Sequence, residues 1–437
     1  MRDLGIAIML TASILLLSIG GQSSMTPDQL KAEVEKASIQ YFIDNANPVT
    51  GHVLDKANNF EANDPANTVA SIASTGFGLA VIANAASRGL VEDKFARDYI
   101  LKTLKFARDH VPRRKGWFLH FYDWNTGERR YSSEYSTIDT AIFIGGALYA
   151  GAVFPNSEIS ITAQQIYRDL DYWDVMTDGG ARPEKRTISM AYVEEYGYTP
   201  AQWQMYAEQM LLIVLGLGHP TKPLPVDAWL AFERDMTPLA TGEPVMGLKE
   251  ALFVHQYSQA FIDFRGFTDR GHNHYSNGLK VSKHHRDMRA GNPKFKSLRE
   301  GFWGYSAGES PKGYEVWDAM NYGGIVCVGC AVASAMFMPN EVIQDLMSWR
   351  NGPYKKKVWG KYGFIDSLDL DQNWFSANVL GITVGPAYMS LANMNEQTSF
   401  WHVFNTIPEI RVGLAKAAHA SEKVADTRKP SGKRVTR

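Results

Sequence analysis

Glu208 is a carboxylate that the sequence places among apolar neighbours. It lies in the stretch TPAQWQMYAEQMLLIVLGLGHP, residues 199–220, which predicts a helix. Its helical neighbours three, four and seven positions away are Met205, Leu211, Leu212 and Leu215. An apolar environment disfavours the charged form of a carboxyl group and raises its pKa, as a general acid near neutral pH requires. The alternative is a helix-edge residue that is solvated or paired with an arginine.

Two more acidic residues stand at the start of a predicted buried helix over residues 134–154. Ser136 and Asp139 fit a capping box, which is a structural role for Asp139. Glu134 precedes that cap, where helix starts project side chains into a site. Hydrolysis of a glycosidic bond normally uses two carboxyl groups. Glu134 and Asp139 therefore join Glu208 as candidate catalytic residues.

Helical patterns run through most of the chain and must position these residues. In the stretch 199–220, Thr199 and Gln202 predict the N-terminal cap, and Gly216 predicts where the helix stops. Further helices are predicted over residues 26–42, 67–90, 91–110, 134–154, 157–177, 226–234 and 248–264. Buried and amphipathic patterns alternate, which indicates paired inner and outer helices in a closed toroid. An irregular all-α domain is the alternative.

The composition is that of a globular protein rich in aromatic residues. The 437 residues have a formal net charge of -1, which gives no reason to expect a nucleic-acid partner. The chain has 11 Trp, 20 Tyr and 21 Phe, and rings of this kind stack on sugars or pack in a core. In the extended segment 116–130, His120, Tyr122, Asp123 and Trp124 face a ligand or form an ordinary half-buried strand.

The two ends of the chain differ in composition from the rest. Residues 1–24 have an apolar run followed by small residues, which predicts a signal peptide or an N-terminal anchor and a periplasmic or secreted protein. Residues 25–414 are expected to form the main domain. The basic tail, residues 415–437, has no apolar period and is predicted to be disordered.

Neither the histidines nor the cysteines indicate a metal or cofactor. The histidines gathered in residues 269–288 are His272, His274, His284 and His285. No carboxylate or Cys stands at a recognised ligand spacing, so no metal is expected. Cys327 and Cys330 form a lone Cys-x-x-Cys in apolar surroundings, which favours buried thiols over a redox centre, although an exported chain could oxidise them to a disulfide.

Several motifs resemble the bacterial group first labelled putative glucoamylase, which includes endo-β-1,2-glucanases of glycoside hydrolase family 144. The matching strings are TVASIASTGFGLA from Thr68, EYSTIDTAIFIGGAL from Glu134, YAEQMLLIVLGLGHPT from Tyr206, LFVHQYSQAFIDFR from Leu252, WGYSAGESPKGY from Trp303 and YGFIDS from Tyr362. They run in order from about residue 67 to residue 404, which is nearly the whole chain after the apolar N-terminal run.

The resemblance implies an (α/α)6 toroid that hydrolyses β-1,2-linked glucan with inversion at the anomeric carbon. It implies that Glu208 is the proton donor and that Glu134 and Asp139 are cleft residues, one of which helps to position water. The residues expected to contact sugar are Asp123, Trp124, Tyr257, Arg265, Trp303 and Tyr305. The partner is an oligo- or polysaccharide and the protein is expected to be a monomer, with membrane contact only through an uncleaved N-terminal segment.

The chain departs from the family near its C-terminal end. Relatives tend to have Asp in a Gly-Ile-Asp-Gln-Gly-Pro string, where this chain has Thr383 and Val384 after Gly381 and Ile382. The family's Asp-Ala-Phe-Asn after YGF begins here with Asp366 and Ser367. These changes leave the general base unassigned. They keep open a glycan-binding protein without catalysis, and a transglycosylase is a further alternative. A polysaccharide lyase is less favoured, because it would need a basic cleft.

Overall fold

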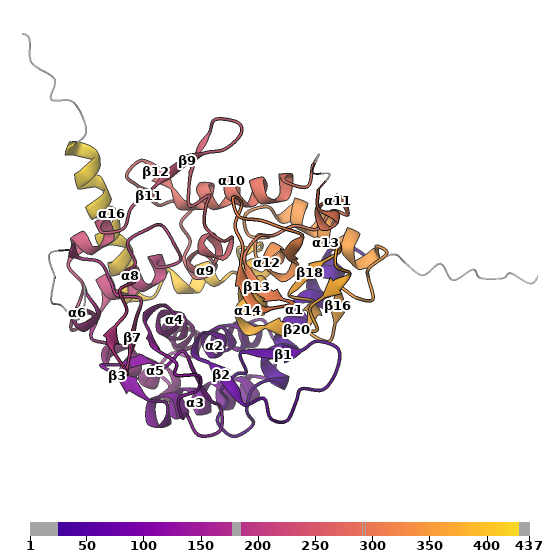
Figure 1. Cartoon of the computed structure of the whole chain (residues 1–437). Coiled ribbons are helices and arrows are strands. Elements are labelled where there is room, and N and C mark those ends of the chain that lie inside the picture. The colour runs from indigo at the N-terminus through magenta and orange to yellow at the C-terminus, as the bar shows by residue number, and fades with distance from the viewer. Residues whose placement is uncertain (1–24, 177–184, 291, 293, 428–437) are drawn as a thin grey trace, which may run out of the picture.

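The computed structural model describes residues 25–176, 185–290, 292 and 294–427 (Figure 1). Most of its regular structure is helical. The helices of eight or more residues are α1 (Pro27–Asp44), α2 (Ile72–Ser87), α3 (Asp93–His110), α4 (Thr137–Val153), α5 (Glu158–Arg168), α8 (Met210–Gly218), α9 (Phe253–Phe261), α10 (His274–Asp287), α13 (Pro339–Asn351), α14 (Gly381–Asn393) and α16 (Pro408–Thr427). The shorter ones are α6 (Tyr172–Val175), η2 (Val226–Leu230), α11 (Lys296–Arg299), α12 (Val328–Val332) and α15 (Phe400–Phe404).

The most apolar helices lie inside and the amphipathic ones pack around them. Every residue of α8 is buried, as are nearly all those of α2, α4 and α14. Helix α2 packs between α4 and α14, while α4 also contacts α8. The amphipathic helices α3 and α5 bury one face against α2 and α4 and present charged residues on the other. The predicted distinction between buried helices and amphipathic helices is confirmed.

Helices α2 and α4 lie side by side at very short range (Figure 1). Gly76 and Gly146 make this approach possible, because a Cβ built on Gly146 would stand 2.0 Å from the carbonyl oxygen of Gly76. Small residues therefore set the separation of these two buried helices. The Ala- and Gly-rich composition of both segments reflects this packing.

Short strands accompany the helices. They are β1 (Lys56–Asn58), β2 (Val69–Ser71), β3 (Arg113–Arg114), β4 (Trp117–Phe118), β5 (Phe121–Asp123), β6 (Tyr135–Ser136), β7 (Ala191–Val193), β8 (Gly197–Tyr198), β9 (Met236–Pro238), β10 (Pro244–Met246), β11 (Thr268–Asp269), β12 (His272–Asn273), β13 (Ala307–Ser310), β14 (Gly313–Val316), β15 (Ile325–Cys327), β16 (Trp359–Gly360), β17 (Gly363–Phe364), β18 (Ser367–Asp369), β19 (Trp374–Phe375) and β20 (Asn378–Leu380). Their sheets have two or three strands, and the paired strands are antiparallel.

The all-α prediction was therefore incomplete. Four strands lead directly into buried helices: β2 into α2, β6 into α4, β15 into α12 and β20 into α14. Such strands have two or three residues, which is too short for an alternating pattern to appear in the sequence. They fix the direction in which the chain enters each helix.

The predicted helix over residues 199–220 begins only at Met210. The preceding residues follow the β7–β8 hairpin instead: the backbone NH of Thr199 donates to the carbonyl of Ala191 (3.0 Å), and that of Trp203 donates to Ile188 (2.8 Å). These pairings occupy the backbone groups that a helix would need. The helix start predicted at Thr199 was wrong because tertiary pairing outweighs the local capping signal.

The predicted disordered tail was wrong for residues 415–427, which continue α16. Ala417, Ala420 and Ser421 are buried, and α16 packs along α8 (Figure 1). The Ser421 hydroxyl donates to Asp269 Oδ1 (2.8 Å) and accepts from Trp229 Nε1 (3.1 Å). This helix buries small residues, so its apolar face is weak in the sequence. Residues 428–437 lie outside the described part of the chain.

The predicted signal peptide or anchor, residues 1–24, also lies outside the described residues. Among those that are described, no helix has the length and apolar character needed to cross a membrane. Cys327 and Cys330 form a disulfide at the start of α12. The interpretation of this pair as buried thiols was therefore wrong, and the oxidised alternative is the one in the structure.

Candidate active site

The three predicted catalytic carboxylates lie at the N-terminal ends of two buried helices that pack together. Glu134 precedes β6, Asp139 is in the first turn of α4, and Glu208 stands two residues before α8. The Asp139 backbone NH donates to Ser136 Oγ (3.3 Å), and this hydroxyl donates to the Asp139 carboxylate. The predicted cap is confirmed. Helix N-termini carry partial positive charge, which stabilises nearby carboxylates.

Glu208 is held in place by a side chain from α9. The Ser258 hydroxyl donates to the carbonyl oxygen of Glu208 (2.5 Å) and accepts from the backbone NH of Leu211 (2.9 Å). One hydroxyl thus fixes the turn that leads into α8 and the residue that carries the carboxyl group. Because the helix starts after Glu208, the apolar neighbours expected on helical spacing are not what surrounds it.

The pKa of Glu208 is nevertheless raised, as the sequence predicts. Burial raises it from 4.5 to about 7, and the negative charges of Asp139 and Glu250 add to the effect. A carboxyl group with this pKa is protonated in an appreciable fraction of molecules at neutral pH. It can therefore donate a proton there, which an ordinary glutamate does poorly.

His120 lies between the other two carboxylates. Its Nδ1 is 2.8 Å from Glu134 Oε1, and its Nε2 is 3.7 Å from Asp139 Oδ1. Burial would lower the pKa of this imidazole, but the charges of Asp139 and Glu134 outweigh it and raise the pKa to about 9. His120 is thus a cation at neutral pH. In turn, burial raises the pKa of Glu134 while the hydrogen bond from His120 lowers it, and the net shift is downward.

Backbone pairing and ring stacking hold His120 in this position. Its NH donates to the carbonyl of Glu134 (2.9 Å), and its carbonyl accepts from Ile72, the first residue of α2 (3.1 Å). The Phe121 ring stacks on the imidazole with the centroids 3.7 Å apart. The segment 116–130 therefore does form strands, as one of its two interpretations predicted, and a ligand contact of His120 stays a prediction.

Asp55 belongs to this cluster although the sequence analysis did not single it out. Burial raises its pKa to about 6, against the opposing charges of His120 and Lys56, and Asp139 raises it further. The carbonyl of Asp55 accepts from the NH of Gly381 at the start of α14 (2.9 Å). Asp55 follows a short buried run with no periodic signal, so only the tertiary pairing brings it here.

Asp366 lies beside the position where relatives tend to have an aspartate. The Thr383 hydroxyl donates to Asp366 Oδ1 (2.8 Å), and Asp366 Oδ2 accepts from the Ser367 hydroxyl and the Glu309 NH (both 2.8 Å). Burial raises the pKa of Asp366 to about 6, in opposition to these hydrogen bonds. Thr383 itself has no carboxylate, but Asp366, on a different segment, places one within hydrogen-bonding distance of it.

The predicted sugar contacts separate into two groups. Tyr257 lies with the carboxylates: burial raises the pKa of its phenol, and the charges of Tyr314, Glu208 and Asp139 raise it further. Its hydroxyl donates to the carbonyl of Ile382 (2.8 Å). Trp124 is half-buried against the main core, and its contact with sugar stays a prediction, as does that of Tyr257.

Three of the predicted sugar contacts have protein partners in the structure: Trp303, Tyr305 and Arg265. Trp303 and Tyr305 are fully buried, and their polar atoms donate to Asp345 (2.9 Å) and to the Gly323 carbonyl (2.9 Å). Arg265 follows the C-terminal end of α9, where Asp263 and Glu396 pair with its guanidinium. The predictions for Trp303 and Tyr305 were wrong, because these aromatic residues are buried in the core, whereas the sugar contact of Arg265 stays a prediction.

Asp123 was also predicted to contact sugar, but it organises its own loop. It accepts from the Thr68 hydroxyl (2.6 Å), from the Asn125 NH (2.8 Å) and from Arg130. Although burial raises the pKa of this carboxyl, these hydrogen bonds lower it well below its usual range. Both carboxylate oxygens have protein partners, and the contact of Asp123 with sugar stays a prediction.

His120, Glu134 and Asp139 are the one group in the described residues whose potential ligand atoms lie within 4.8 Å of one another. The Nδ1 of His120 is occupied by Glu134, and a protonated imidazole has no lone pair for a metal. The contacts are those of a charge-paired cluster. The expectation that the protein uses no metal or cofactor stays a prediction.

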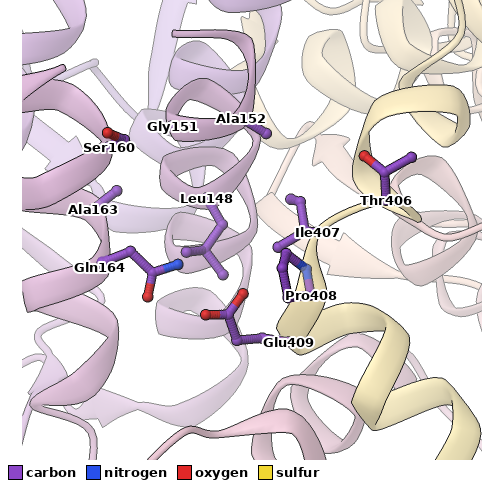
Figure 2. A pocket seen from close by; sticks show the side chains of 10 residues that line it. All are labelled: Leu148, Gly151, Ala152, Ser160, Ala163, Gln164, Thr406, Ile407, Pro408 and Glu409. Carbon is purple, nitrogen blue, oxygen red and sulfur yellow. The ribbon is translucent and has the colours of Figure 1, made fainter. Parts of the chain in front are cut away.

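A pocket on another part of the molecule does not include these residues. Figure 2 shows it between α4, α5 and the start of α16, with Leu148, Gln164 and Glu409 among its lining side chains. Its lining residue Gly151 is twelve positions beyond Asp139 on α4, which is about 18 Å along a helix. None of the site carboxylates lines this pocket.

The family model described as "Glycoamylase: Putative glucoamylase" matches residues 200–408 of the chain. The family resemblance is confirmed. The match includes Glu208, Tyr257, Asp366 and Thr383, whereas Glu134 and Asp139 lie before it.

Individual relatives have similar sequences and structures. An exo-β-1,2-glucooligosaccharide sophorohydrolase (non-reducing end) of Parabacteroides distasonis is 23% identical in an alignment of 432 residues. The alignment covers 90% of this chain. The chain spans 58% of that relative's length. An endo-β-1,2-glucanase from Chitinophaga pinensis, solved with sophorotriose and glucose, has a TM-score of 0.82 at 23% identity and covers 90% of this chain and 98% of its own.

A fungal structure shares the fold at lower identity. The endo-β-1,2-glucanase of Talaromyces funiculosus, solved with sophorose, has a TM-score of 0.65 at 12% identity, with 92% of this chain and 90% of that chain covered. At these identities the structural likeness shows the fold.

Proposed function

We propose that the protein is a glycoside hydrolase that cleaves β-linked glucan, and specifically an endo-β-1,2-glucanase with an inverting mechanism. The observation that carries the proposal is Glu208, a carboxyl group whose pKa burial and the charge of Asp139 raise to about 7, together with Glu134, a carboxyl group whose pKa the hydrogen bond from His120 lowers. Relatives named as β-1,2-glucanases and as a sophorohydrolase support the choice of substrate.

In the proposed reaction, Glu208 gives its proton to the oxygen of the glycosidic bond. The bond between that oxygen and the anomeric carbon breaks while a water molecule attacks the carbon from the opposite face. A carboxylate accepts the proton that the water loses. Asp139, whose charge acts on Glu208, and Asp55, whose charge acts on Asp139, are the candidates for this base.

We assign His120 a positioning role in this scheme. As a cation it lowers the pKa of Glu134 and so favours the ionised form of that carboxyl group. Its two ring nitrogens face the two carboxylates and set the distance between them. Glu134 is then fixed by His120 and positions the water or the sugar.

We further propose that the helices close into an (α/α)6 toroid with the site at one mouth. The inner helices would be α2, α4, α8, α9, α12 and α14. Packing of α2 on α4, α4 on α8, α8 on α9, α9 on α14 and α12 on α14 supports this arrangement. The outer helices would be α1, α3, α5, α10, α13 and α16.

We also propose that the protein is exported. The Cys327–Cys330 disulfide supports a periplasmic or secreted location, because disulfides persist mainly in oxidising compartments. The apolar run at the start of the chain is the segment that would direct export.

Product analysis tests the proposed function. The protein is incubated with linear β-1,2-glucan and, separately, with β-1,3-, β-1,4- and β-1,6-glucans, and NMR follows the anomeric form of the new reducing ends. The proposal expects short oligosaccharides from β-1,2-glucan, released first as the α-anomer. Binding without products would support a glycan-binding protein, and chains longer than the substrate would support a transglycosylase; either result rejects the proposal.

A further inference from the structure

Tyr131 is an exposed aromatic residue in a strained backbone conformation. It lies between β5 and β6, and its exposed fraction is 77%. Tyr131 has φ of 54° and the next residue, Ser132, has φ of 51°. Non-glycine residues rarely adopt positive φ, and a bulky side chain makes it costly. Such strain concentrates at functional sites, where the surrounding structure maintains it.

Two arginines that directly precede Tyr131 and Ser132 hold the loop in this conformation. The Arg129 guanidinium donates to the carbonyls of Ser132 (2.7 Å) and Ser133 (2.6 Å) and pairs with Glu195. Arg130 pairs with Asp123 and donates to the Thr68 hydroxyl (2.9 Å). The contacts of the two arginines thus fix the loop while the Tyr131 ring stays exposed.

The ring stands next to the candidate active site. Its centroid is 6.3 Å from that of Phe121, with the edge of one ring towards the other. Phe121 stacks on His120, which bonds to Glu134.

Core packing does not account for this arrangement. A ring that is 77% exposed buries little apolar surface, and a single edge contact with Phe121 stabilises the fold only slightly. Glycine would adopt the same backbone without strain. The chain instead exposes a large flat ring on a fixed loop. Only the ring of Phe121 separates it from His120 along this line of contacts.

We propose that Tyr131 is a stacking platform for a glucosyl unit of the glucan outside the cleaved linkage. The proposal rests on the proposed function and adds a subsite to it. The face of a pyranose carries C–H groups that pack on an aromatic ring, and the hydroxyl rim stays in water. A platform separated from Glu134 by Phe121 and His120 would bind a distant unit. Tyr131 would therefore set a preference for longer chains.

The test compares Tyr131→Ala, Tyr131→Gly and Tyr131→Phe with Phe95→Ala, a control on an exposed aromatic residue of α3. We measure KM and kcat on β-1,2-linked oligosaccharides of increasing length, together with the melting temperature. Removing the ring should raise KM about 3- to 10-fold on long chains, with little change on the shortest substrate or in kcat. Tyr131→Phe should retain the wild-type KM.

Stability separates a binding role from a structural one. Tyr131→Gly should melt at the wild-type temperature or above it, because glycine relieves the strain at positive φ. A lower melting temperature with unchanged KM would overturn the proposal in favour of a structural role. If the wild type cleaves the glucan and the KM of Tyr131→Ala equals that of the wild type for every chain length, only the subsite is rejected. If the wild type neither cleaves nor binds it, the proposed function fails as well.

Discussion

The Nδ1 atom of His120 lies 2.8 Å from Oε1 of Glu134, in a cluster where the imidazole has a pKa of about 9. The second ring nitrogen faces Asp139 at 3.7 Å. One cation therefore serves two acidic groups that would otherwise repel each other. No cation pairs with Glu208 in the described part of the chain, and Glu208 retains its proton to higher pH. The site thus contains carboxyl groups of two kinds, as acid and base catalysis requires.

Replacing His120 with glutamine should impair catalysis without removing the other side chains of the cluster. A hydrogen bond to a charged group contributes about 1.5 to 3 kcal/mol, which corresponds to a loss of about 10- to 100-fold in kcat/KM. The acidic limb of the pH profile should move to higher pH, because the charge of His120 would no longer lower the pKa of Asp55, one of the candidate bases. The exposed His402→Gln is the control. An unchanged limb would show that His120 has no such role.

The hydrolysis rate should decrease at alkaline pH because Glu208 must be protonated. Its pKa is raised to about 7, so the protonated fraction falls about tenfold for each pH unit above that value. We expect kcat/KM for linear β-1,2-glucan to follow this decrease between pH 7 and 9. Stability measured over the same range shows whether the loss reflects unfolding. A folded protein with constant activity up to pH 9 would be inconsistent with Glu208 as the acid.

Gly146→Ala should destabilise the fold strongly. The new Cβ would stand 2.0 Å from the carbonyl oxygen of Gly76, so α2 and α4 would have to move apart. Overpacking of this kind costs about 1 to 3 kcal/mol or more in the free energy of unfolding. Gly266→Ala is the matched control, because no atom lies within 4 Å of its Cβ position. Denaturant unfolding of both variants measures the difference, and equal stability would show that the helices are not in close contact.

Local signals predicted much of the fold. The cap of α4 follows from Ser136 and Asp139, and the buried character of α2, α4 and α8 follows from their composition. The start of α8 could not be predicted, because the backbone of Thr199 and Trp203 pairs with Ala191 and Ile188 instead of forming helical hydrogen bonds. The same holds for α16, whose buried face consists of small residues.

The site was predictable only where it depends on local sequence. Glu134 and Asp139 stand at a recognisable helix start, whereas Asp55 reaches the cluster through a pairing with Gly381, more than three hundred residues along the chain. The burial of Trp303 and Tyr305 likewise depends on neighbours that are far away in sequence. Aromatic residues do not reveal from their identity whether they line a cleft or fill a core.

The most direct test of the account measures Glu208→Gln on two substrates. Linear β-1,2-glucan needs a protonated leaving oxygen, whereas a dinitrophenyl β-sophoroside releases a stable phenolate without one. The account predicts that the variant cleaves the glucan about 100- to 10,000-fold more slowly than the wild type but hydrolyses the aryl substrate at a similar rate. Glu243→Gln, at a surface ion pair, should match the wild type on both. Equal losses on the two substrates, or an unchanged rate on the glucan, would contradict the assignment of Glu208 as the acid.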